Sequence, residues 1–176
     1  MGQGLEFPPA IKLAAIGLGG NEFSTLGPPE NTLKAVFPLL ARESVTLRAI
    51  SRFYKTPAFP PGSGDDFINA VAILETKLSP HELLLILHQI ETACGRQRRG
   101  RWGSRTMDLD LLMMGDAVLP DRQTYCTWAN LPADMQRTRA PDQLVLPHPR
   151  LQDRAFVLIP FAEVAPLWVH PVTGLS

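Results

Sequence analysis

Two carboxylates and a cluster of arginines lie within residues 96–110. Asp108 and Asp110 stand two positions apart at the start of an apolar run, and alternate residues of a β-strand share one face. Both carboxylates are therefore expected to point the same way, while Leu109 and Leu111 turn into a core. Carboxylate oxygens are ligands for a hard divalent cation such as Mg²⁺.

The segment before this pair carries several guanidinium groups, whose planar forks match phosphate oxygens. They belong to Arg96, Arg98, Arg99, Arg101 and Arg105. Interspersed glycines favour a mobile loop here rather than a helix. Taken alone, an Asp-x-Asp pair is usually a solvated strand edge, and an arginine run is more often a solvated face or a nucleic-acid patch. Their combination favours a site for a metal ion and nucleotide phosphates.

The composition bounds the class of protein. The chain has 176 residues, enough for one domain with a core, and its 17 basic and 17 acidic groups give a formal net charge of zero. This balance argues against partners such as nucleic acid or an anionic membrane. Cys94 and Cys126 are far apart and lack metal-ligand spacing, so we expect free thiols in a cytoplasmic protein. We expect neither a targeting segment nor a membrane span.

Hydrophobic periodicity predicts four strands and three helices. The predicted strands cover residues 12–18, 45–54, 67–77 and 108–114, and the predicted helices cover residues 31–43, 80–94 and 151–164. Ser79 and Glu82 have the spacing of a capping box before the second helix. Pro38 is expected to end or kink the first helix, and a break is expected near Pro160 in the third.

The order of these elements predicts an α+β fold. Strand, helix, strand, strand, helix, strand is the βαββαβ pattern of a ferredoxin-like sandwich, with an antiparallel sheet and helices on one face. An extra C-terminal helix follows. We interpret residues 1–176 as a single domain, with a loose leader over residues 1–10 and an insertion at about 120–142, which has one helical turn around 132–137.

The sequence lacks the usual nucleotide-binding motifs. It contains neither a Gly-x-x-x-x-Gly-Lys-Ser/Thr loop nor the protein-kinase set of motifs. The run from Gly17 to Gly20 lacks the third glycine of a dinucleotide-binding turn and is better explained as a tight turn after a strand.

Several segments in order nevertheless resemble the 6-hydroxymethyl-7,8-dihydropterin pyrophosphokinase family. The matching segments are residues 16–21, 51–57, 66–70, 90–91, 95–96, 101–110 and 147–150, followed by Arg154 and Phe156. The resemblance spans Ile16 to Pro166 and implies a ferredoxin-like fold. It implies transfer of a diphosphoryl group from ATP, as co-substrate, to the hydroxymethyl oxygen of the pterin, with attack at the β-phosphorus and release of AMP in folate biosynthesis.

The resemblance also implies roles for individual residues. Asp108 and Asp110 would hold two Mg²⁺ ions, and Arg96 and Arg105 would clamp phosphates. The implied ATP-binding residues are Glu91, Arg101, Trp102, His148 and Arg154. The implied pterin-binding residues are Thr56, Pro57, Ala58, Phe59, Phe67, Asn69 and Phe156. The two rings of Phe67 and Phe156 would sandwich the pterin, and Asn69 would read its polar edge.

Some positions depart from the family pattern, and another class of function remains to be tested. Gly20 replaces a common Ser, Phe67 a common Tyr, and Pro149 a frequent aromatic. Taken singly, Phe67 and Phe156 also fit a core, and His148 fits a loop. A ligand-binding ferredoxin-like module, regulatory or RNA-binding, is the alternative, although RNA readers need exposed aromatics on the central strands. Release of AMP from ATP on addition of pterin separates the two hypotheses. A monomer is expected.

Overall fold

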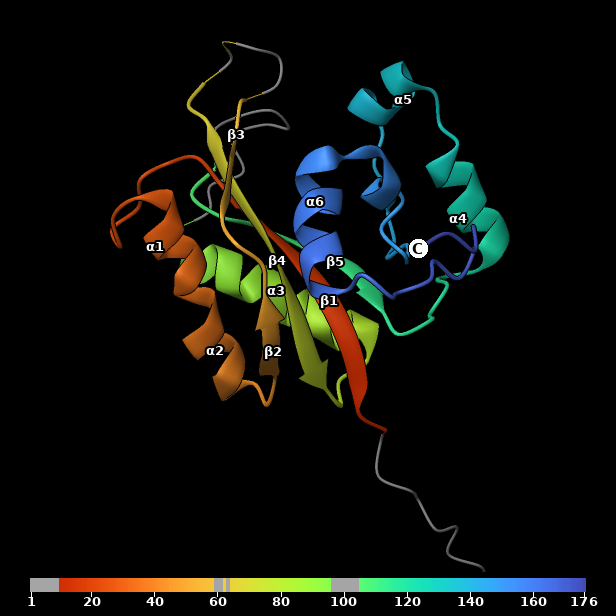
Figure 1. Cartoon of the computed structure of the whole chain (residues 1–176), viewed down its shortest axis with the longest axis horizontal. Helices are drawn as coiled ribbons and strands as arrows, with labels where there is room; N and C mark the ends of the chain where they lie inside the picture. Colours follow the sequence, from red (N-terminus) through yellow and green to blue (C-terminus); the bar gives the residue numbers. More distant parts are fainter. Residues whose placement is uncertain (1–9, 59–61, 63, 96–104) are drawn as a thin grey trace, which may run out of the picture.

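The computed structural model describes residues 10–58, 62, 64–95 and 105–176. Its centre is a five-stranded antiparallel sheet in the order β2-β4-β1-β5, with β3 also paired to β4 (Figure 1). The strands are β1 (Lys12–Gly20), β2 (Thr46–Ile50), β3 (Tyr54–Thr56), β4 (Phe67–Thr76) and β5 (Asp108–Met114). The third strand of the βαββαβ pattern is β4. It lies between β1 and β2, the first and second strands of the pattern, as the ferredoxin-like prediction requires.

Three helices cover one face of the sheet. They are α1 (Pro29–Lys34), α2 (Val36–Arg42) and α3 (Pro80–Ala93). Alternate residues of the strands, among them Ile16 and Leu109, are buried there against Leu33 and Leu87. This cluster forms because successive side chains of a strand point to opposite faces.

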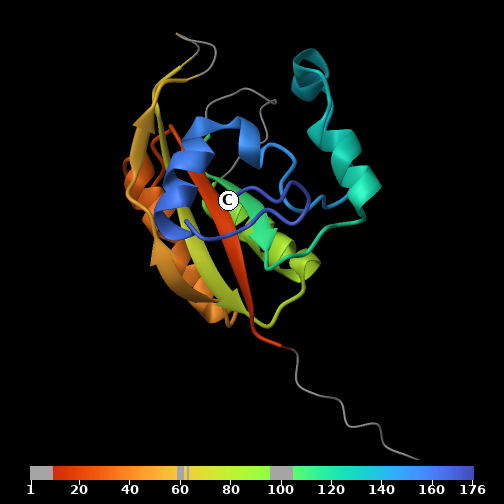
Figure 2. The same ribbon diagram turned by 45° about the vertical axis from the view of Figure 1, so that its right-hand side comes forward.

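A single helix covers the other face. It is α6 (Ala155–Val164), which follows a 3₁₀ turn at Leu151–Asp153 (Figure 2). Val157 and Phe161 of α6 pack on Val71 of β4 and Leu112 of β5, in a second apolar cluster. The extra C-terminal helix is therefore confirmed, and it closes the face that the other helices leave open.

The prediction for Pro38 is confirmed, and the prediction for Pro160 is wrong. The first helix is interrupted at Ala35, one turn before Pro38, because Pro38 has no N–H for the carbonyl of Lys34 and its ring crowds that carbonyl. The predicted break near Pro160 is wrong, since α6 continues through it. Pro160 is buried against the sheet, and this burial compensates for the one hydrogen bond that the helix loses.

The segment predicted as an insertion contains two helices, α4 (Arg122–Ala129) and α5 (Ala133–Thr138). The turn around residues 132–137 was predicted, but α4 was missed. Asp121 caps α4, because its side chain accepts hydrogen bonds from the backbone N–H and the hydroxyl of Thr124. Tyr125 of α4 is buried and lies 2.8 Å from Nε2 of His170, so this helix is anchored by the C-terminal segment.

The longest helix, α3, begins with the predicted capping box. The Ser79 hydroxyl accepts from the N–H of Glu82 at 3.3 Å, and the Glu82 carboxylate accepts from the N–H of Ser79 at 2.7 Å. Gly95 follows the helix with a φ of 82°, which suits glycine. In the part of the chain that the structure describes, no helix has the length and hydrophobicity to cross a bilayer.

The capping box yields a stability prediction. Ser79→Ala should lower the free energy of unfolding by about 1 kcal/mol, because the N–H of Glu82 loses its side-chain acceptor. Urea unfolding followed by circular dichroism measures this. Glu82→Gln is the matched control, since glutamine keeps the reciprocal bond to Ser79, and it should cost much less. Equal losses in the two variants would contradict a role for the box itself.

Candidate active site

Three strands bring the candidate residues together at one end of the sheet. Asn69 of β4 is paired with Gly19 of β1, and Gly19 is paired with Asp108 of β5. Asp108 and Asp110 are half-buried on the face covered by α6, whereas Leu109 between them is buried on the opposite face. The prediction that the two carboxylates share one face is therefore confirmed. The glycine between Asn69 and Asp108 leaves the middle of this row without a side chain.

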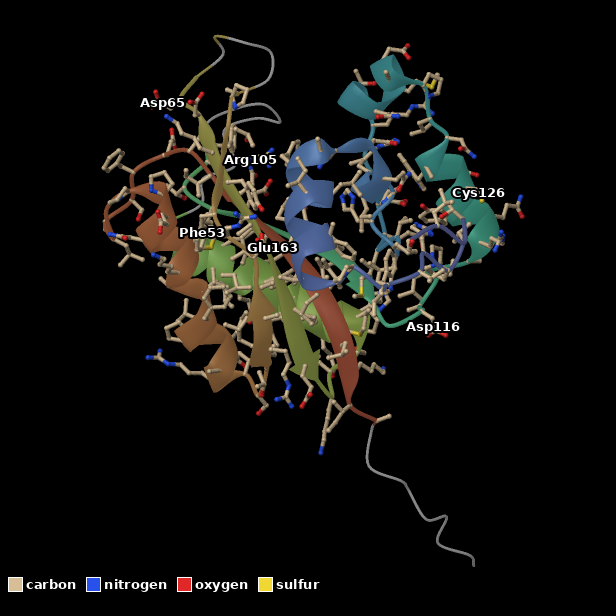
Figure 3. All side chains as sticks on the ribbon, viewed as in Figure 1. Phe53, Asp65, Arg105, Asp116, Cys126 and Glu163 are labelled. Carbon is tan, nitrogen blue, oxygen red and sulfur yellow. The ribbon has the colours of Figure 1, made fainter. Side chains whose placement is uncertain are left out.

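Arg105 lies immediately before β5 and forms an ion pair with Asp108. The segment around Arg105 is held by Asn21, whose Oδ1 accepts from the N–H of Arg105 at 2.8 Å and whose own N–H donates to the Arg105 carbonyl at 2.9 Å. Asn21 is 5% exposed, and its Nδ2 also donates to the carbonyl of Asp65. Figure 3 shows Arg105 and Asp65 toward one end of the sheet and Asp116 toward the other.

Asn21 thus joins the loop after β1 to the segments that precede β4 and β5. The sequence analysis did not include it among the site residues. The available signal was its place in the matching segment of residues 16–21, because a buried asparagine after a strand needs partners for both its oxygen and its nitrogen.

His148 lies beside β5, where its backbone N–H donates to the Leu112 carbonyl at 2.7 Å. Its Nδ1 accepts from the N–H of Arg150 at 3.1 Å, so the proton of the neutral ring belongs on Nε2. Burial lowers the pKa of His148 to about 3, and the charges of Arg154 and Arg150 act in the same direction, while Asp108 opposes them. His148 is therefore a neutral hydrogen-bond donor at physiological pH.

Arg154 and Phe156 flank the start of α6. The guanidinium carbon of Arg154 lies 5.8 Å from the centre of the Phe156 ring, a cation–π distance. Phe156 is 42% exposed, which is unusual for a phenylalanine of an ordinary core. Its exposure argues against an ordinary core residue, and the predicted contact of Phe156 with the pterin stays a prediction.

Except for Phe156, the described residues among the predicted pterin ligands lie on or beside β3 and the start of β4. Asn69 is 7% exposed, and its Nδ2 donates to Oγ1 of Thr56 at 2.7 Å. Phe67, two residues earlier on β4, is half-buried and is paired with Thr56 in the sheet. Pro57 is exposed and Ala58 is buried. Thr56 therefore links the two predicted pterin residues of β4.

Glu91 lies on the side of the sheet opposite to Asp108 and Asp110. Its carboxylate is 2% exposed near the end of α3, and Oε1 accepts from the N–H of Leu109 at 2.7 Å. This bond fixes the backbone between Asp108 and Asp110 from the opposite side of the sheet. The predicted contact of Glu91 with ATP stays a prediction. Arg96, Arg101, Trp102 and Phe59 lie outside the described residues.

A hydrogen-bonded network fixes α6 against the rest of the site. Oε2 of Glu163, in the last turn of α6, accepts from the hydroxyl of Tyr54 at 2.9 Å, and Arg52 pairs with the same carboxylate at 3.1 Å. These bonds lower the pKa of Glu163, with the bond from Tyr54 acting most strongly. Tyr54 is paired with Asn69 in the sheet. The network therefore joins the helix that carries Phe156 to the strands that carry Thr56 and Asn69.

The carboxylate pair fits a magnesium ion. Mg²⁺ is commonly bound through one or two carboxylates together with substrate phosphates and water. Among the described residues, no group of three or more His, Cys, Asp or Glu side chains forms a complete metal site. Asp108 and Asp110 therefore suit an ion that takes its remaining ligands from a phosphorylated substrate.

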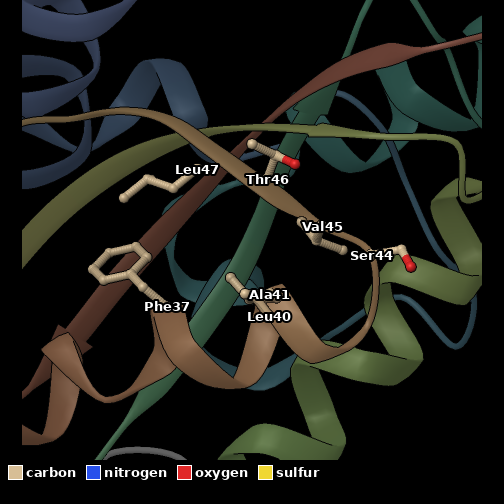
Figure 4. Close-up of a pocket in the computed structure, with 7 residues that line it drawn as sticks. All are labelled: Phe37, Leu40, Ala41, Ser44, Val45, Thr46 and Leu47. Atoms are coloured by element: carbon tan, nitrogen blue, oxygen red, sulfur yellow. The ribbon is translucent and has the colours of Figure 1, made fainter.

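Two hollows of the surface lie apart from this pair. One, of about 360 Å³, lies between α2 and β2 and is lined mainly by apolar side chains such as Phe37 and Leu40 (Figure 4). The other, of about 580 Å³, lies beside Asn21 and is lined by Phe23, Lys55 and Asp66, among others. Neither of these two hollows includes Asp108 or Asp110.

Comparisons with known proteins agree with this arrangement. A family model described as 7,8-dihydro-6-hydroxymethylpterin-pyrophosphokinase (HPPK) matches residues 15–166. The 2-amino-4-hydroxy-6-hydroxymethyldihydropteridine pyrophosphokinase of Synechocystis sp. is 37% identical over 170 residues, which cover 96% of this chain and 74% of that protein. The protein of the same name from Haemophilus influenzae is 35% identical over 159 residues, covering 90% of this chain and 84% of that one.

A solved structure shares the fold. Wild-type HPPK-DHPS of Plasmodium falciparum superimposes with a TM-score of 0.65 at 14% identity, over 95% of this chain and 43% of that chain. The chain thus spans less than half of that longer protein. With a family model that matches most of its length, the chain belongs to the 7,8-dihydro-6-hydroxymethylpterin pyrophosphokinase family.

The lowered pKa of His148 predicts a pH dependence of stability. Below pH 6.5 the unfolded chain protonates this histidine, whereas the folded protein stays neutral until about pH 3. Stability should therefore fall as the pH decreases through this window, with a contribution from His148 of up to about 1.4 kcal/mol per pH unit.

Urea unfolding between pH 7 and pH 4, without nucleotide or metal, measures this contribution. His148→Asn keeps an acceptor for the N–H of Arg150 and should give a shallower slope. His81→Asn, at an exposed position of α3, is the control and should keep the slope of the parent protein. If His148→Asn also kept that slope, the burial of a neutral His148 would be contradicted.

Proposed function

We propose that this protein transfers a diphosphoryl group from ATP to 6-hydroxymethyl-7,8-dihydropterin in folate biosynthesis. The observation that supports this most strongly is the row formed by Asn69, Gly19 and Asp108 across three strands. It sets a polar group suited to a pterin edge beside a carboxylate suited to a metal. Membership of the pyrophosphokinase family supports the same reaction.

The spacing of this row suits the two substrates. Adjacent strands are separated by about 4.8 Å, so Asn69 and Asp108 lie two spacings apart, at roughly 10 Å. A pterin whose edge is bound by Asn69 would extend its hydroxymethyl group over Gly19 toward the carboxylates. The phosphates of ATP would reach the same place from the side of Arg105, His148 and Arg154.

In the proposed reaction the hydroxymethyl oxygen attacks the β-phosphorus of ATP. The bond between the β-phosphorus and the oxygen that bridges to the α-phosphorus breaks, AMP leaves, and the hydroxyl proton is released. When bound to Asp108 and Asp110, two Mg²⁺ ions would neutralise charge on the phosphate oxygens. Arg105 would shift from Asp108 toward phosphate, and the Nε2–H of His148 would donate to a phosphate oxygen.

The remaining groups would hold and enclose the substrates. Phe67 and Phe156 would stack on the two faces of the pterin ring, with α6 held in place through Glu163. Arg96 would clamp the phosphates, and Arg101 and Trp102 would close over the substrates and exclude water, which would otherwise hydrolyse ATP. We also propose that the chain forms a single domain, acts as a cytoplasmic monomer, and needs neither nucleic acid nor a membrane.

The first functional prediction concerns the metal ligands. Asp110→Asn should lower turnover by about 100-fold or more, because an amide oxygen binds Mg²⁺ more weakly than a carboxylate does. AMP release from ATP on addition of the pterin, measured over a range of magnesium concentrations, is the assay. Asp116→Asn, the same change in the exposed turn after β5 (Figure 3), should keep normal turnover.

Two results would contradict the proposal. If Asp110→Asn kept normal turnover at saturating magnesium, the metal assignment would be wrong. If the parent protein released no AMP with both substrates present, the reaction itself would be wrong, and the chain would be a binding module.

The second functional prediction concerns pterin recognition. Asn69→Ala should weaken pterin binding by about 1–3 kcal/mol, because polar groups of the buried ligand edge lose their partner. Calorimetry with the pterin and with ATP reports the two affinities separately, and the affinity for ATP should change little. Asn130→Ala, at the exposed end of α4, is the control. An equal loss of both affinities in Asn69→Ala would make Asn69 a structural residue.

A further inference from the structure

The central strand β1 carries glycine where the neighbouring strands carry the site residues. Gly17 and Gly19 both face α6, because Ile16 and Leu18 are buried on the opposite face. Neither glycine has a positive φ. The special backbone freedom of glycine is therefore not needed at these two positions, and the neighbours that a side chain would meet distinguish them.

A side chain at position 19 would be crowded by its neighbours. A Cβ atom at this position would lie 3.2 Å from Oδ1 of Asn69 and 4.0 Å from Cβ of Asp108. The first distance is shorter than the usual contact between a methyl group and an amide oxygen, so Asn69 would have to move by a few tenths of an ångström.

Asn69 has little freedom to make this movement. Its side chain is 7% exposed, and its Nδ2 is bonded to Oγ1 of Thr56 at 2.7 Å. Thr56 belongs to β3, which is itself paired with β4. Displacement of the Asn69 amide would therefore lengthen the bond to Thr56 or rotate the groups that Asn69 presents to a ligand.

Gly17 is different, although it lies on the same strand and the same face. A Cβ atom there would meet only side-chain carbons of Leu112, at 3.6–3.8 Å. These are ordinary van der Waals distances, so an alanine fits without displacement of its neighbours. The chain thus supplies its own matched control for the removal of a strand glycine.

We propose that Gly19 is a positioning residue. Because Gly19 has no Cβ atom, the Asn69 amide keeps the orientation in which it hydrogen-bonds to a ligand. The proposal rests on the proposed function, since it assumes that Asn69 reads the pterin. It extends that function to a residue that has no side chain to contact the substrate. Gly17 carries no such role.

The test compares Gly19→Ala with Gly17→Ala. We expect Gly19→Ala to raise the dissociation constant of the pterin by about tenfold, as small misplacements of binding groups do. The titration uses the pterin with saturating magnesium and α,β-methylene-ATP, in which the bond that must break is replaced by a stable one. The affinity for the ATP analogue should stay within about twofold, and Gly17→Ala should leave both affinities within about twofold.

A double-mutant cycle with Asn69→Ala then tests the route of the effect. In the Asn69→Ala background the clashing oxygen is gone, so Gly19→Ala should change pterin affinity by less than about twofold. A further tenfold loss in that background would show that a methyl group at position 19 blocks the pterin directly, and would overturn the proposal. Unchanged pterin affinity in Gly19→Ala alone would also overturn it.

Two further readouts keep the outcome decisive. The side-chain amide NMR signals of Asn69 should shift in Gly19→Ala but not in Gly17→Ala, without any ligand. If Asn69→Ala itself leaves pterin binding intact, the proposed site fails, and these amide signals still decide whether Gly19 positions Asn69. If Gly19→Ala does not fold, recovery of folding in the double variant supports the proposal, and no recovery overturns it.

Discussion

The pairing of the central strand β1 with β4 and β5 is the constraint on which the site depends. It aligns Asn69, Gly19 and Asp108 in one row, and Val71, Gly17 and Asp110 in the next. Because side chains alternate along a strand, a slip of one residue would turn the amide or the carboxylates of its strand to the face covered by α1, α2 and α3. The buried residues of that face, such as Ile16 and Leu109, make such a slip costly, so the core also secures the register of the site.

The two faces of the sheet have different roles. The face under α1, α2 and α3 supplies most of the apolar core, and from that side Glu91 supports the backbone of β5. The other face combines apolar packing under α6 with the end of the sheet where the carboxylates, Asn69 and Phe67 lie. Because α6 is attached both by its apolar contacts and by Glu163, the position of Phe156 depends on contacts at the far end of the same helix.

The segment between β5 and α6 also has a structural role. The Arg150 guanidinium donates to the carbonyl of Ala129 at the end of α4, and the buried ring of His170 contacts Tyr125 of the same helix. Trp168 donates to the carbonyl of Gly115, directly after β5. Helix α4 and the C-terminal segment therefore brace the loop that carries His148, and of the residues that make these contacts only Arg150 lies in a matching segment.

The sequence by itself determined the βαββαβ order of the main elements, the capping box of α3, the shared face of Asp108 and Asp110, and the family, because these follow from local periodicity, strand alternation and short motifs. Tertiary structure decided what depends on distant partners. The roles of Asn21 as a clamp on Arg105 and of Glu91 as a support for β5, as well as the course of α6 through Pro160, were of this kind. In each case a buried group is satisfied or stabilised by residues far along the chain, and local sequence does not identify those partners.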